Sequence, residues 1–199
     1  MSFLEELKQK KTKLKACNTV ITTTTGERFI ENSTTHVTEK LNTTPIYGFV
    51  VDTKPDFKPA QILNNFLYLG SQDAVNMENI KEYKLTHILS IGIECPPLED
   101  LPSSLKKLYV PCLDLPETNL KEQGILSKAF DFIEAVRLIN GRILVHCNAG
   151  VSRSATIVIA YLMQFHNMDF DMAYKQVKSQ RECIQPNAGF LKQLKGFKN

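Results

Sequence analysis

The pattern of hydrophobic and polar positions changes near residue 60. Beyond that point short apolar runs alternate with longer amphipathic segments, whereas the preceding residues are mostly polar. The short runs predict strands, because continuous apolar stretches of about four to eight residues are typical of strands buried on both faces. We therefore expect about five strands, at residues 62–63, 66–69, 86–91, 107–110 and 141–146.

The segments between and after these strands predict helices. Apolar residues recur there every three or four positions, which is the spacing of one helix face. These segments are residues 73–84, 122–139, 172–181 and 187–197. Residues 155–165 are almost wholly apolar and predict a buried helix. Strands that alternate with helices predict an α/β fold, with a central, mostly parallel sheet flanked by helices on both faces.

Residues 1–57 are predicted to form an N-terminal extension, and residues 58–199 a single domain. Residues 3–15 have the spacing of a short amphipathic helix. Residues 19–30 place β-branched side chains on both sides of a glycine, which is typical of a hairpin. Residues 31–57 are polar and contain two prolines, so they predict a linker.

Composition narrows the class of protein. With 199 residues, of which 43% are hydrophobic, the chain can bury a core, and its net charge of +3 does not indicate nucleic acid as a partner. No run approaches the roughly 18 apolar residues of a membrane span. Five cysteines without a Cys-x-x-Cys pair argue against a disulfide framework or a structural zinc site. We expect a cytoplasmic, or also nuclear, protein with no cofactor, metal, nucleic-acid partner or membrane partner.

One run of residues carries the strongest indication of chemistry. Val145-His-Cys-Asn-Ala-Gly-Val-Ser-Arg-Ser-Ala155 lies between a predicted strand and a predicted helix. A tight loop at the carboxyl end of a parallel strand directs backbone N–H groups inward, and the following helix adds its positive N-terminal end. Such a nest binds a tetrahedral oxyanion and favours the thiolate form of Cys147. We therefore expect Cys147 to be a nucleophile.

The neighbouring side chains suit a bound phosphate. Arg153 can fork onto two phosphate oxygens, Gly150 permits close approach of the backbone, and the hydroxyl of Ser154 can donate to a departing thiolate. The alternative is a structural cysteine in a strand-to-helix turn, because a Cys six positions before an Arg also arises by chance. The buried strand, the loop of small residues and the apolar helix favour the catalytic interpretation.

The same run resembles the signature of a known superfamily. His-Cys, five residues and then Arg-Ser is similar to the signature of the cysteine-based protein tyrosine phosphatases, and the full loop resembles their dual-specificity branch. Segments Leu67–Ser71, Thr86–Leu89 and Pro186–Phe190 match that branch as well. Residues 1–40 and 113–119 further resemble its small atypical members.

This resemblance covers about residues 60–199 and implies a fold, a reaction and a set of site residues. The fold is that of a protein tyrosine phosphatase, with a dual-specificity catalytic domain at residues 58–199 that works through a phosphocysteine. The implied supporting residues are His146, Ser154 and Asn187, the last also a plausible helix N-cap. The implied phosphate-binding loop consists of Asn148, Ala149, Gly150, Val151, Ser152 and Arg153.

A phosphatase of this kind needs an acid that protonates the leaving oxygen. The resemblance places this acid about thirty residues before the nucleophile, which is Asp114 here, and Glu117 is the second candidate. His146 precedes the nucleophile and is either a general base or a residue that supports the loop. Adjacent residues on a strand point to opposite faces, so we favour the supporting role.

The substrate class follows from the loop. Residues 148–152 are neutral, whereas related phosphoinositide phosphatases tend to carry a lysine there, and RNA triphosphatase relatives have a different loop. By resemblance, the short catalytic segment implies a shallow pocket, and therefore phosphoproteins carrying phosphotyrosine, phosphoserine or phosphothreonine. A lipid or glucan phosphatase is disfavoured.

The alternative function is a scaffold or adaptor that binds kinases through the N-terminal extension, with catalysis secondary. A basic and hydrophobic run there resembles a docking site for mitogen-activated protein kinases, although such runs are more often a solvated helix face. The run consists of Lys10, Lys11, Lys13 and Leu14. It suggests these kinases, or the kinases upstream of them, as partners.

Overall fold

The structure is a computed structural model, and it divides the chain into two compact units, residues 1–51 and residues 52–199. It describes residues 19–22, 28–31, 37–41, 56–96 and 102–197.

The first unit contains a small antiparallel sheet with strand order β1-β2-β3. Its strands are β1 (Thr19–Thr22), β2 (Arg28–Glu31) and β3 (Thr38–Leu41). Strands β1 and β2 pair where the sequence predicts a hairpin, and β3 lies within the predicted linker. Apolar runs do not predict strand β3, because its backbone hydrogen bonds to β2 do not depend on apolar side chains. The helix predicted at residues 3–15 lies outside the described residues.

The second unit is built on a five-stranded sheet with the order β4-β5-β8-β6-β7. Strand β4 is antiparallel to β5, and the other three pairings are parallel, which confirms the predicted mostly parallel sheet. The inner strands β5, β6 and β8 are buried along their whole length, as their continuous apolar runs predict. The strands are β4 (Ala60–Leu63), β5 (Leu67–Gly70), β6 (His87–Ile91), β7 (Lys106–Val110) and β8 (Ile143–His146).

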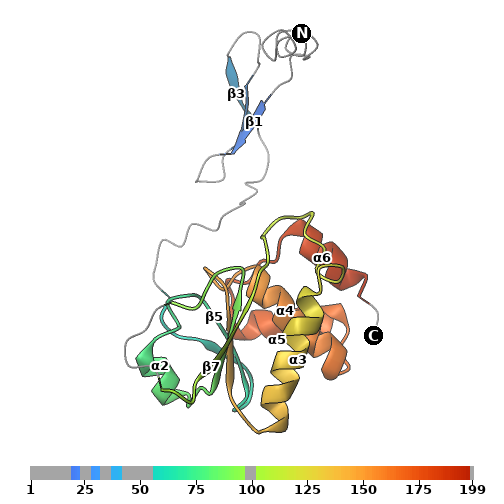
Figure 1. The fold of residues 1–199 in the computed structure, drawn as a ribbon. Helices are drawn as coiled ribbons and strands as arrows, with labels where there is room; N and C mark the ends of the chain where they lie inside the picture. The colour runs from blue at the N-terminus through green and yellow to red at the C-terminus, as the bar shows by residue number, and fades with distance from the viewer. Residues whose placement is uncertain (1–18, 23–27, 32–36, 42–55, 97–101, 198–199) are drawn as a thin grey trace, which may run out of the picture. The chain divides into compact units, whose positions relative to one another are not determined.

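Helices cover both faces of this sheet, as predicted, but unequally. One face carries the short helix α2, and the other carries α3, α4, α5 and α6 (Figure 1). Helix α2 is shorter than the predicted 73–84, because Asn76 caps it by accepting a hydrogen bond from Asn79 N. The helices are α2 (Met77–Glu82), α3 (Ile125–Leu138), α4 (Arg153–Phe165), α5 (Phe170–Gln180) and α6 (Ala188–Lys195).

Helix α4 lies at the centre of the larger core. Every residue from Ser154 to Met163 is buried, and the helix packs on β5, β6 and β8 as well as on α3, α5 and α6. Burial of each large aliphatic side chain contributes about 1.5–3 kcal/mol. The start of α4 is therefore held firmly at the carboxyl end of β8. In the part of the chain that the structure describes, no helix has the length and apolar character that crossing a membrane requires.

Candidate active site

The loop between β8 and α4, residues 147–152, is held from outside through its carbonyl groups. The carbonyl oxygens of four successive residues each accept a hydrogen bond from a group beyond the loop. The donors are Gln72 N to Asn148 O (2.8 Å), Arg181 Nη2 to Ala149 O (2.9 Å), Arg181 Nε to Gly150 O (2.9 Å) and Gln185 N to Val151 O (2.8 Å).

Because these four carbonyl groups point outward to their donors, the direction of the N–H groups of the loop is determined as well. In a trans peptide the N–H points away from the preceding carbonyl, and the described residues contain no cis peptide. The N–H groups of residues 149–152 are therefore directed to the opposite, concave side of the loop. Gly150 has a φ of +65°, and a Cβ there would collide with the carbonyl of Gly70. The result is a preformed nest for an anion.

Arg181 is a residue of this site that the sequence reasoning missed. Its side chain is almost completely buried behind the loop, where two nitrogens bind the loop carbonyls and the third, Nη1, pairs with Asp56 Oδ2 at 2.5 Å. A lone arginine at the end of a predicted helix and a lone aspartate in a predicted linker form no motif. The burial of a charged side chain, visible only in the structure, is the signal that identifies it.

Cys147 and Ser154 are brought together as the sequence predicts. Cys147 is only 2% exposed, and the hydroxyl of the buried Ser154 donates to its Sγ at 3.1 Å. A hydrogen bond to sulfur stabilises a sulfur that carries negative charge. Ser154 is therefore well placed to stabilise the sulfur of Cys147 when the latter is a leaving group.

The guanidinium of Arg153 has one donor that makes no hydrogen bond. Its Nη1 donates to Gly92 O at 2.9 Å, a partner that the sequence reasoning missed. Its Nε is buried and has no hydrogen-bond partner among the described residues, with Asp114 Oδ2 at 3.6 Å. Buried donors are rarely left unpaired in folded proteins. A buried donor without a hydrogen bond therefore suits an oxyanion that binds in the nest.

Asp114 lies beside this arginine, on the acid loop, which we define as residues 111–124 between β7 and α3. Its Oδ1 accepts hydrogen bonds from Ser152 Oγ at 2.7 Å and Asn187 Nδ2 at 2.8 Å. The hydroxyl of Ser152 in turn accepts from Asn187 N at 3.2 Å. The structure thus gathers Ser152 and Asn187 around Asp114, beside Arg153. Glu117 is exposed and lines a separate pocket between the acid loop and α6.

His146 is fully buried, and both of its ring nitrogens have partners. Burial lowers its pKa to about 4, so the imidazole is neutral near pH 7. Nδ1 donates to Cys147 O at 3.3 Å, because a carbonyl can only accept, and Nε2 accepts from Ser90 Oγ at 2.7 Å. Neither nitrogen is free to act on the Cys147 thiol, which favours the supporting role over that of a general base.

The other described cysteines are Cys95, Cys112 and Cys183. All four described cysteines are free, and burial raises the pKa of Cys112 to about 12 and also raises that of Cys95. Both thiols are therefore protonated near neutral pH. Within the described residues, no group of three or more His, Cys, Asp or Glu side chains is placed to hold a metal ion.

Comparison with known proteins agrees with the chemistry of this loop. Residues 67–199 match the family model described as Dual specificity phosphatase, catalytic domain. The chain belongs to this family of protein phosphatases, as its resemblance to the dual-specificity branch predicts.

Particular relatives are similar over most of the chain. Mouse Dual specificity protein phosphatase 19 is 39% identical over 189 residues, which are 90% of this chain and 81% of that protein. The crystal structure of DUSP15 is 35% identical, with a TM-score of 0.61, over 70% of this chain and 86% of that one. The crystal structure of the human tyrosine phosphatase-like serine/threonine/tyrosine-interacting protein is 30% identical, with a TM-score of 0.63, over 71% of this chain and 95% of that one.

We expect Arg181→Met to weaken phosphate binding by the loop. The substitution keeps an apolar stem but leaves the carbonyls of Ala149 and Gly150 without their donors. An unsatisfied buried acceptor costs about 1–3 kcal/mol, so kcat/KM should fall about 10- to 100-fold. Steady-state kinetics with aryl phosphates check this, and good and poor leaving groups should be affected equally because Asp114 is untouched.

Asp56→Asn is the matched control for Arg181→Met, because it alters only the third contact of the guanidinium. The amide oxygen still accepts from Nη1 and the loop carbonyls keep their donors, so a smaller loss of kcat/KM is expected, although removal of the counter-charge lowers stability. A normal rate in the Arg181→Met variant would mean that the loop keeps its shape without the guanidinium.

Proposed function

We propose that the chain hydrolyses phosphotyrosine and phosphoserine or phosphothreonine in proteins through a phosphocysteine formed on Cys147. The observation that carries the proposal is the outward fixing of four successive loop carbonyls, which turns the intervening N–H groups toward a bound oxyanion. The buried Nε of Arg153, which makes no hydrogen bond and has Asp114 Oδ2 at 3.6 Å, adds a charged donor beside this nest. Phosphate is the oxyanion that such a loop and a cysteine nucleophile suit together.

The first step transfers the phosphoryl group to the protein. The thiolate of Cys147 attacks phosphorus, and the S–P bond forms while the bond from phosphorus to the substrate oxygen breaks. The carboxyl group of Asp114 donates its proton to that oxygen as it leaves. Arg153 and the loop N–H groups bind the remaining phosphate oxygens, where negative charge accumulates.

The second step releases phosphate and regenerates the protein. The carboxylate of Asp114 removes a proton from water, and the water oxygen attacks phosphorus as the S–P bond breaks. The electron pair of that bond returns to sulfur, and the Ser154 hydroxyl, 3.1 Å away, donates to the departing thiolate. Inorganic phosphate leaves, and Asp114 is protonated for the next cycle.

We further propose that the substrates include components of the mitogen-activated protein kinase pathway, which the resemblance of Lys10, Lys11, Lys13 and Leu14 to a kinase docking site supports. The neutral residues 148–152 support phosphoprotein substrates over phosphoinositides. The similarity to mouse Dual specificity protein phosphatase 19 supports action on phosphotyrosine as well as phosphoserine and phosphothreonine.

A cysteine nucleophile has to stay reduced, which favours a cytoplasmic or nuclear location for the protein.

A peptide that carries phosphothreonine and phosphotyrosine on either side of one residue tests the proposal. Full-length protein is expected to release phosphate from both residues, with kcat/KM values within about 10²-fold of each other, because a shallow pocket discriminates by few contacts. Mass spectrometry of the singly phosphorylated products measures the two rates. Release from phosphotyrosine alone would reject dual specificity while leaving the phosphocysteine chemistry intact.

The second candidate function is a kinase-binding adaptor. It is favoured by the similarity to a protein named as tyrosine phosphatase-like and as an interacting protein, and by residues 1–51 being a separate compact unit. The same peptide assay, combined with kinase binding, separates the two functions when full-length protein is compared with residues 52–199. If the chain is an adaptor, removal of residues 1–51 abolishes kinase binding. If it is a phosphatase that needs no docking, residues 52–199 still release phosphate from both phosphothreonine and phosphotyrosine.

A further inference from the structure

Helix α6 holds the acid loop through one side-chain amide, that of Gln193. Its Nε2 donates to Thr118 O at 2.9 Å, and its Oε1 accepts from Leu120 N at 2.9 Å. Nε2 also lies 3.4 Å from Gly189 O on the helix itself. One amide therefore pairs with both a carbonyl and an N–H of the acid loop, in the manner of a neighbouring strand.

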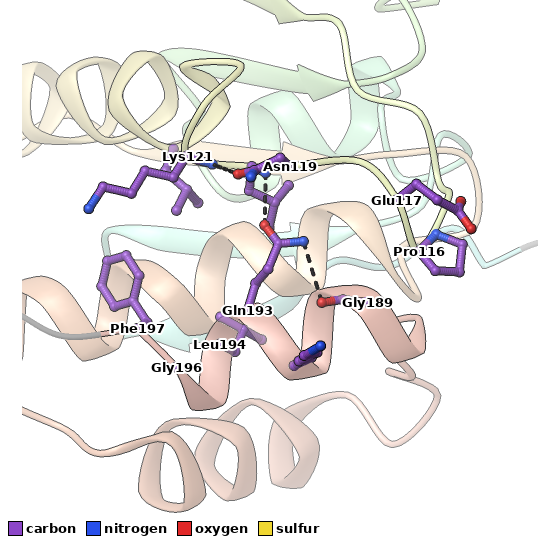
Figure 2. A pocket seen from close by; sticks show the side chains of 12 residues that line it. Pro116, Glu117, Asn119, Lys121, Gly189, Gln193, Leu194, Gly196 and Phe197 are labelled. Carbon is purple, nitrogen blue, oxygen red and sulfur yellow. Dashed lines mark hydrogen bonds between the residues drawn. The ribbon is translucent and has the colours of Figure 1, made fainter.

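A cavity lies beside this contact, although Leu120 of the acid loop and Leu194 of α6 are both buried in the main core. A cavity of about 650 Å³ separates the acid loop from α6. Figure 2 shows Gln193 reaching across from α6 toward Asn119, with Pro116 and Glu117 at one end of the cavity and Phe197 at the other. The two hydrogen bonds of Gln193 therefore add directional contacts to the apolar packing of Leu120 on this side of the loop.

The other side of the loop is held by the beginning of the same helix. Asn187 donates to Asp114, and a Cβ at Gly189 would collide with the carbonyl of Pro116, so helix and loop backbones are in close contact there. Thr118 is only 5% exposed and Leu120 only 2%, which places the Gln193 contacts in a buried segment. Helix α6 thus fixes the acid loop at separate points on either side of the cavity.

We propose that Gln193 is a positioning residue for the general acid of this phosphatase. Gln193 fixes the loop at residues 118–120, close in sequence to Asp114, so release of that contact lengthens the segment that can move together with Asp114. Gln193 thereby keeps Asp114 within reach of the leaving oxygen. This inference rests on the proposed function, in which Asp114 supplies the proton.

The test compares two substrates that differ in their need for an acid. Phenolate is a poor leaving group, so phenyl phosphate needs an acid that protonates the departing oxygen. The 4-nitrophenolate anion is stabilised, so 4-nitrophenyl phosphate needs little protonation. We expect Gln193→Met to raise the ratio of kcat/KM for the nitrophenyl over the phenyl substrate about tenfold, because a misplaced acid loses part of a contribution of about 10²–10⁴. The fraction of folded protein cancels in this ratio, so lost stability alone cannot produce the change.

Gln176→Met is the matched control. Gln176 on α5 makes a comparable side-chain bond, from Nε2 to Ile62 O at 3.3 Å, but has no contact with the acid loop. Its substitution should leave the ratio unchanged. In protein that already carries Asp114→Asn, Gln193→Met should change the ratio no further, because no acid is left to misplace.

The outcomes separate this inference from the proposed role of Asp114. If Asp114→Asn raises the ratio and Gln193→Met does not, Gln193 is merely structural and the inference is overturned. If Gln193→Met raises the ratio and Asp114→Asn does not, the positioning role stands but another carboxyl of the acid loop is the acid. Equal losses for both substrates in Gln193→Met would likewise contradict a positioning role.

Discussion

Replacing Cys147 by serine is expected to abolish phosphate release from aryl phosphates and phosphopeptides, with a loss of about 10⁴-fold or more. A serine hydroxyl stays protonated near neutral pH and is a weak nucleophile toward phosphorus. The new side chain is no larger than the old one, and the contacts that fix the loop carbonyls do not involve Sγ. The nest should therefore keep its shape and still bind the oxyanion.

Steady-state turnover of 4-nitrophenyl phosphate measures the loss, and calorimetric titration with inorganic phosphate tests whether the nest survives. Cys183→Ser is the matched control, because Cys183 is exposed after α5 and lies outside the site. Its turnover should equal that of the unmodified protein. Turnover that persists in Cys147→Ser would mean that another group attacks phosphorus and that the mechanism is wrong.

The second large effect is expected from Asp114→Asn. Removal of a general acid costs about 10²–10⁴-fold, so kcat/KM for phenyl phosphate should fall by at least about 10². The decline of kcat/KM at high pH that a protonated acid produces should disappear from the pH profile. The amide oxygen of asparagine can still accept from Ser152 and Asn187, so the acid loop should remain in place.

Glu117→Gln distinguishes the two candidate acids. Glu117 lies on the same loop, but it is exposed and lines the cavity beside α6 instead of facing Arg153. Its substitution should leave both the rate and the pH profile unchanged. The opposite result, a normal Asp114→Asn variant and a slow Glu117→Gln variant, would transfer the acid role to Glu117.

Periodicity predicts the second unit well because its elements are buried in the manner that the patterns assume. Strands β5, β6 and β8 are covered on both faces, and helix α4 is buried along most of its length, so continuous apolar runs mark them. Strand β3 is different, because residues 37–40 are all exposed and only its pairing with β2 makes it a strand. Hydrophobic pattern carries no information about such a strand.

The site residues also fall into two groups, those close together in the sequence, which can be predicted, and those joined by distant contacts, which cannot. Cys147, Arg153 and Ser154 lie within one short run, so their spacing is visible in the sequence. Arg181 and Gln193, in contrast, bind backbone atoms that lie 31 to 75 residues away along the chain. Contacts between a side chain and distant backbone leave no pairing of residue types for a motif search to find, and the one side-chain partner of Arg181, Asp56, is itself distant in the sequence.

The contact between Asp56 and Arg181 determines where a functional catalytic fragment has to begin. A fragment that starts at residue 58, the boundary that composition suggests, lacks the carboxylate that neutralises the guanidinium behind the phosphate loop. It also lacks the carbonyl of Asp56, which accepts from Ser71 Oγ at 2.8 Å. An unpaired buried charge costs several kcal/mol. A single residue outside the boundary at residue 58 thus supplies two contacts on which the folded catalytic unit depends.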